Sequence, residues 1–105
     1  MTQKEIAFNH LRRQLCVDDE AAIAEIYNEF LASFPRKIAA ARAALAAADW
    51  KRLEETAHTI KGDSAIVGLG QLRDLAMALQ EAGKARDRDS CRRLAEELER
   101  GFSPI

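Results

Sequence analysis

Apolar residues recur three and four positions apart through most of this 105-residue chain, which is the period of an amphipathic α-helix. The clearest run has no gap and consists of Ile23, Ile26, Tyr27, Phe30, Leu31 and Phe34. The chain contains only five glycines and two prolines, and alanine and leucine supply much of its apolar content. This composition favours helices over strands. The pattern therefore predicts an all-α fold.

Aspartates precede three of the apolar segments, and aspartate is a preferred N-cap because its side chain accepts hydrogen bonds from the first free backbone N–H groups. The expected caps are Asp18 or Asp19, then Asp49, then Asp87 or Asp89. Pro35 lacks a backbone N–H, so we expect it to interrupt the first long helix or to open the next. Glycine commonly ends a helix in a left-handed conformation. Gly68 and Gly70 are expected to end the helix that contains His58, and the next helix is expected to close near Gly83.

The connections between these segments are short, so consecutive helices are expected to be antiparallel neighbours. The predicted fold is a single domain over residues 1–105: an antiparallel up-down four-helix bundle with a short extra N-terminal helix, capped by Asn9 and running to Gln14. The third bundle stripe has the spacing of a bundle seam and contains Trp50, Leu53, Ala57, Ile60, Ser64 and Val67. We expect residues 1–8 and 102–105 to be loosely ordered.

The charge balance gives no sign of a nucleic-acid or membrane partner, because 16 basic and 17 acidic residues leave a net charge of -1. No apolar run has the length of a membrane span, and the first residues do not form a signal peptide. We expect a cytoplasmic monomer. Cys16 and Cys91 lack motif spacing and are expected to be reduced thiols rather than a disulfide. Met1 is compatible with a free-standing protein and with a fragment of a hybrid kinase.

His58 lies in the middle of the third bundle segment, away from its apolar stripe. At about 100° per residue the stripe clusters roughly 140° from His58, so the imidazole is expected to face solvent. Lys61 falls at roughly 60° on one flank and Gly62 at roughly 40° on the other. A glycine inside a helix costs about 1 kcal/mol relative to alanine. Gly62 therefore suggests that something large must reach His58.

The surface on either side of His58 differs in character. After Gly62, the same face carries the small or apolar residues Ala65, Ile66 and Leu69, which predict a docking surface for a protein. Before His58 the residues are charged: Lys51, Glu54 and Glu55. The next helix runs back antiparallel and should place Gln80 level with His58. The Gln80 amide oxygen is expected to accept a hydrogen bond from Nδ1–H, which leaves Nε2 free and pointing outward.

The stretch Ala57-His58-Thr59-Ile60-Lys61-Gly62-Asp63-Ser64-Ala65, followed by Gly68, resembles the motif of the histidine-containing phosphotransfer (HPt) family of two-component phosphorelays. The resemblance covers roughly residues 8 to 102. It implies that His58 exchanges a phosphoryl group with the aspartate of response-regulator receiver domains, including those of hybrid sensor kinases. Within that scheme Lys61 stabilises the phosphoryl oxygens, Gly62 leaves room for the partner, and Gln80 orients the ring.

The resemblance also implies a phosphocarrier that is not a kinase and has no cofactor of its own, with Mg²⁺ on the partner receiver domain. One departure is Asp63, because the family usually has a small residue at this position. Asp63 should lie roughly 140° from His58 around the helix, so we expect it to spare the chemistry while altering docking. The chain has no ATP-binding motif, so labelling from ATP alone is not expected.

Three other interpretations of His58 and its surroundings are open from the sequence. A lone histidine on a helix is usually a solvated side chain. The stretch Glu55-Thr56-Ala57-His58 matches the Glu-x-x-His motif of di-iron bundles, which requires a second copy. His10 is the only other histidine and has Ala7 at the matching offset, so a metal site is disfavoured. The main alternative function is a non-catalytic helical adaptor that binds a partner through the apolar strip after His58.

Overall fold

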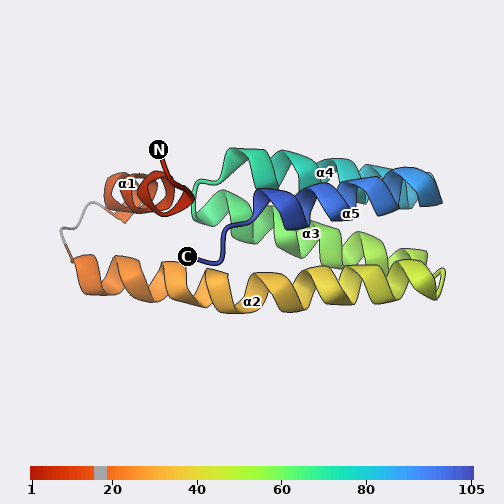
Figure 1. Ribbon diagram of the computed structural model, residues 1–105, viewed down its shortest axis with the longest axis horizontal. Coiled ribbons are helices and arrows are strands. Elements are labelled where there is room, and N and C mark those ends of the chain that lie inside the picture. The colour runs from red at the N-terminus through yellow and green to blue at the C-terminus, as the bar shows by residue number, and fades with distance from the viewer. Residues whose placement is uncertain (16–18) are drawn as a thin grey trace.

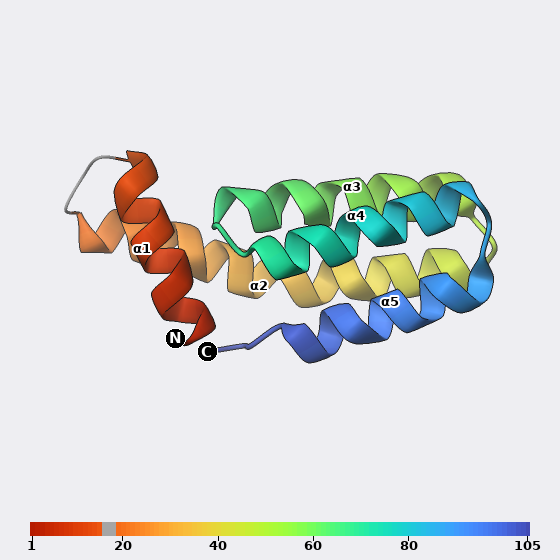
Figure 2. The ribbon, with the colours of Figure 1, turned by 90° about the horizontal axis from the view of Figure 1, so that it is seen from above.

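The computed structural model describes residues 1–15 and 19–105, and these residues form five α-helices without a strand (Figure 1). They are α1 (Gln3–Leu15), α2 (Glu20–Ala46), α3 (Trp50–Ile66), α4 (Gly70–Lys84) and α5 (Arg88–Gly101). Helices α2 to α5 form an antiparallel ring in which each packs against two neighbours (Figure 2). The prediction of an all-α four-helix bundle is confirmed. No helix of the described residues is long and apolar enough to cross a membrane.

The predicted aspartate caps form at the starts of α2, α3 and α5. Asp19 accepts hydrogen bonds from the backbone N–H groups of Ala21 and Ala22, and Asp49 accepts one from Arg52. Asp87, rather than Asp89, caps α5. Hydrogen bonds from the side chain and the backbone of Ser90 lower the pKa of the Asp87 carboxyl. Asp18 and Cys16 lie outside the described residues.

Pro35 does not divide α2, which runs unbroken for 27 residues, so the predicted interruption is wrong. Its ring is exposed, and the apolar stripe continues in phase on both sides of it, with Phe34 and Ile38 buried. Burying a large apolar side chain contributes about 1.5–3 kcal/mol. Packing of this stripe thus offsets the cost of about 3 kcal/mol for proline inside a helix. Helix α2 gives the molecule its long dimension of 44 Å.

The three turns of the bundle have the same backbone hydrogen bonds. At the end of α3, the Gly68 N–H donates to Ala65 and the Leu69 N–H donates to Ser64, which is the Schellman arrangement. Gly68 has a left-handed φ of 74°, as predicted for a helix stop. The other two turns place a non-glycine residue there: Ala48 (φ 55°) and Arg86 (φ 53°). The expectation that Gly70 ends α3 is wrong, because Gly70 begins α4. Helix α4 ends at Lys84, next to Gly83, as predicted.

The N-terminal helix begins at Gln3, so the predicted start at Asn9 is wrong. Gln3 joins the two ends of the chain: its side-chain Nε2 donates to Tyr27 Oη and to the Ser103 carbonyl, and its Oε1 accepts from the Ser103 N–H. These hydrogen bonds connect Gln3 and Ser103, which lie in the two terminal segments expected from the sequence to be loosely ordered. Helix α1 packs on α2, and five aromatic rings gather there: Phe8, Tyr27, Phe30, Phe34 and Phe102.

The core of the bundle contains the stripes that the periodicity predicts. The buried seam residues of α3 are Leu53, Ala57, Ile60 and Ser64, and Val67 is buried just after them. Cys91 is a buried free thiol on α5, and burial raises its pKa. The hydroxyl of Ser64 is buried without a hydrogen-bond partner.

Candidate functional site

His58 is exposed in the middle of α3, on the side away from the buried seam. Its neighbours Ala57 and Ile60 are 0% and 1% exposed, so the helix is anchored directly beneath it. This is the placement that the 3.6-residue period predicts. The imidazole therefore projects from a rigid helix rather than from a loop, which keeps its position defined while leaving it accessible.

A shallow hollow of about 530 Å³ joins His58 to α4. Its lining consists of Lys51, Glu54, Glu55, His58, Thr59 and Gln80. Gln80 is thus level with His58, as the antiparallel register predicts. Among the hydrogen bonds of the described residues, none joins the side chains of His58 and Gln80. The orienting role of Gln80 stays a prediction.

Gly62 lies one turn beyond His58 and is exposed. A Cβ built on this glycine would meet no atom within 4 Å outside its own helix. Helix packing therefore does not require glycine at this position, and alanine would form a better helix. Gly62 leaves an open space beside His58 that any longer side chain would narrow.

Lys61 is partly buried and forms no hydrogen bond or ion pair with any residue that the structure describes. It does not line the hollow that contains His58 and Gln80. Its long, flexible side chain can bring the ammonium close to the imidazole of His58. The electrostatic role of Lys61 remains a prediction.

The apolar face after Gly62 is shorter than the sequence suggests. Ala65 is exposed, and Ile66 is 62% exposed, which is high for such a large apolar side chain. Leu69 is only 6% exposed, so its predicted place on the docking surface is wrong. The prediction extended the helical period past Ile66, but α3 ends there and the chain reverses at Gly68. The apolar face beyond His58 therefore consists of Gly62, Ala65 and Ile66.

A narrow groove of about 170 Å³ lies between α2 and α3 beside Ile66. Its lining consists of Ile26, Glu29, Phe30, Ser33, Lys37, Asp63, Ile66 and Val67. Asp63 forms an ion pair here with Lys37 of α2. Asp63 thus turns toward α2, as its predicted angle from His58 implies. Sequence reasoning missed this pair because its partners are 26 positions apart.

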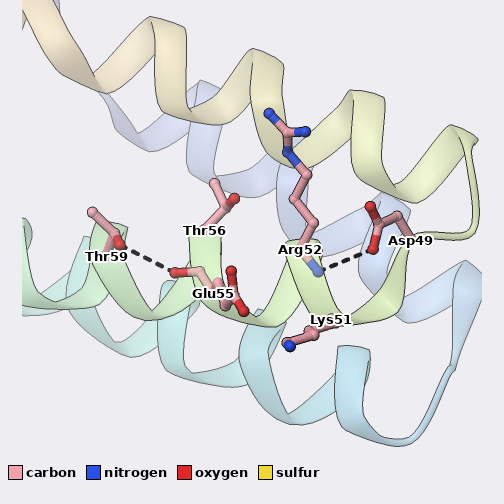
Figure 3. Close-up of a pocket in the computed structure, with 6 residues that line it drawn as sticks. All are labelled: Asp49, Lys51, Arg52, Glu55, Thr56 and Thr59. Carbon is pink, nitrogen blue, oxygen red and sulfur yellow. Dashed lines mark hydrogen bonds between the residues drawn. The ribbon is translucent and has the colours of Figure 1, made fainter.

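A second, charged hollow lies on the N-terminal half of α3 (Figure 3). It shares Lys51, Glu55 and Thr59 with the hollow of His58. Figure 3 shows the guanidinium of Arg52 extending toward α2, away from Lys51 and Glu55.

Among the described residues, no group of three or more His, Cys, Asp and Glu side chains is placed to hold a metal ion.

Comparison with known proteins assigns this helical bundle to a family. The family model described as Hpt domain matches residues 25–103, which include most of α2, all of α3 to α5, and His58. The chain belongs to the Hpt family. It is 38% identical over 60 residues to Multistep phosphorelay regulator 1 of Schizosaccharomyces pombe. That match covers 57% of this chain but only 20% of the fission-yeast protein, so this chain spans about a fifth of its relative. No solved structure shows a significant match.

Proposed function

We propose that His58 accepts and donates a phosphoryl group as a phosphorelay intermediate, exchanging it with the aspartate of response-regulator receiver domains. The observation that carries this proposal is the exposed imidazole beside Gly62, where a Cβ would meet nothing within 4 Å. Family membership and the likeness to a protein named as a phosphorelay regulator support a phosphotransfer role.

The proposed step is a single displacement. The His58 Nε2 lone pair forms a P–N bond as the P–O bond of the receiver's acyl phosphate breaks, and the departing aspartate carboxylate keeps the electron pair. Nδ1 retains its proton, which Gln80 would hold by accepting a hydrogen bond. Lys61 would neutralise charge on the phosphoryl oxygens. Such transfer depends on positioning and electrostatics, which a rigid helix with an open flank can provide.

The proposal makes this chain a phosphocarrier rather than a kinase. A divalent cation and the reacting aspartate would come from the receiver domain, including receivers of hybrid sensor kinases. We further propose that the bundle works as a monomer in the cytoplasm. The monomer is supported by the way α2 to α5 bury their apolar stripes against one another. Because the proposed carrier has no kinase activity of its own, ATP alone should leave the chain unlabelled.

The experiment is phosphoryl transfer from a panel of receiver domains labelled with [³²P]acetyl phosphate. Wild-type protein should acquire an acid-labile, base-stable label, and His58→Gln should acquire none. His10→Gln is the matched control, since it removes the only other histidine and should keep the label. Label on His58→Gln at the wild-type level, or no label on wild type from any receiver, would overturn the proposal.

One observation favours the second candidate, a non-catalytic adaptor. Ile66 is 62% exposed beside the groove between α2 and α3, and exposed apolar surface of this kind can bind a partner without chemistry. An adaptor would bind a receiver domain without acquiring label, and Ile66→Ser would weaken that binding. A carrier would acquire the label.

A further inference from the structure

The charges that share the hollow with His58 are mostly negative. Glu55 and Glu54 stand three and four positions before His58 on α3, and both line the same hollow. Residues at these spacings are surface neighbours, with Cβ atoms about 5–6 Å apart. Any group attached to the imidazole at this point would therefore lie within one helical turn of two carboxylates.

These carboxylates are not neutralised by partners. Neither Glu54 nor Glu55 forms a side-chain hydrogen bond or ion pair with any residue in the described part of the chain. Glu54 packs against α4, where its Cγ lies 3.4 Å from the place that a Cβ on Gly83 would occupy. Lys51 is the one cationic side chain in the hollow's lining, so a negative charge remains in excess.

We infer that Glu54 and Glu55 raise the free energy of phosphorylated His58 and so favour transfer of the phosphoryl group away from this chain. This inference rests on the proposed function. A phosphoryl group carries a charge of about −1.5 to −2 near pH 7. Across about 8 Å of solvated surface, repulsion by each carboxylate should change the transfer equilibrium about twofold, and by the pair about fourfold. Lys51 acts in the opposite direction.

The test uses one receiver domain that labels the wild-type bundle. It measures the final distribution of label between the two proteins, starting once from phosphorylated receiver and once from phosphorylated bundle. Glu54→Gln/Glu55→Gln should move the plateau about fourfold toward the phosphorylated bundle, and Lys51→Gln about twofold away from it. Glu25→Gln is the matched control. This exposed carboxylate stands near the start of α2, roughly 20 Å along the bundle from the level of His58, and its removal should change nothing.

The equilibrium separates charge repulsion from docking. A variant that only weakens docking slows transfer in both directions and leaves the plateau unchanged. In 1 M salt, where the screening length falls to about 3 Å, the shift should largely disappear. An unchanged plateau in the double variant, or a shift that persists in 1 M salt, overturns this inference while leaving the phosphocarrier proposal intact. Failure of wild type to acquire label overturns the phosphocarrier proposal itself and the inference with it.

Discussion

Gly62 and Gly68 are six residues apart, one in the exposed middle of α3 and the other in the turn that ends this helix. A Cβ on Gly68 would lie 2.2 Å from Cγ of His10 on α1, and the φ of Gly68 is left-handed at 74°. A Cβ on Gly62 would meet nothing within 4 Å, and its backbone is helical.

The two glycines therefore have different reasons: the fold requires the glycine at position 68 but not the one at position 62. Gly68 satisfies the fold, because both its backbone conformation and the approach of α1 exclude a side chain. Gly62 weakens the helix and relieves no contact inside the chain. Since the fold does not account for Gly62, its reason must lie in something that approaches the helix from outside, beside His58.

The largest effect on stability is expected at Gly68. Gly68→Ala should lower the free energy of unfolding by about 2–5 kcal/mol, through the left-handed backbone of an alanine and the clash with His10. Urea unfolding followed by circular dichroism measures this loss. His10→Ala combined with Gly68→Ala should recover the steric part only. A double variant whose stability is no higher than the sum of the two single changes predicts would show that the clash is not the cause.

Intermediate effects are expected at the other two bundle turns, which have the geometry of the Gly68 turn without its glycine. Ala48→Gly and Arg86→Gly should each raise the free energy of unfolding by about 1 kcal/mol, because a left-handed non-glycine residue costs about 1–2 kcal/mol and glycine gives part of this back in chain entropy. The same urea titration applies. A loss of stability in both variants would mean that left-handed strain is not what makes glycine necessary at position 68.

At Gly62 the expected effects on stability are equal to or smaller than those at the two turns, and they are stabilising. Gly62→Ala should stabilise the bundle by about 1 kcal/mol and Gly62→Gln by about 0.5 kcal/mol, as helix propensities predict for an exposed interior position. Thermal and urea unfolding both report this change. Destabilisation by either side chain would reveal a contact that the fold requires and would remove the contrast with Gly68.

Local features of the fold could be predicted from the sequence, whereas features set by distant residues could not. The caps Asp49 and Asp87 and the exposure of His58 depend on neighbours within one or two helical turns. Pro35 was misjudged because packing against other helices keeps α2 continuous. Leu69 was misplaced because a helical period cannot be extended through a left-handed turn.

The candidate site divides in the same way. The periodicity of α3 places His58, Lys61 and Gly62, and the antiparallel register places Gln80 at the hollow. The ion pair between Lys37 and Asp63 joins two helices at positions that no sequence pattern links. That Glu54 lies against α4 likewise depends on how closely α4 approaches at Gly83, which only the packed structure reveals.

The most direct test of the contrast between the two glycines is the rate of phosphoryl transfer to Gly62→Gln from a labelled receiver domain. The account predicts a folded bundle at least as stable as wild type and a rate lower by about 100-fold or more, because a displacement of about 1 Å at the reacting centre can cost that much. Transfer at the wild-type rate in this stable variant would contradict the account, since it would show that the open space beside His58 is not needed for access.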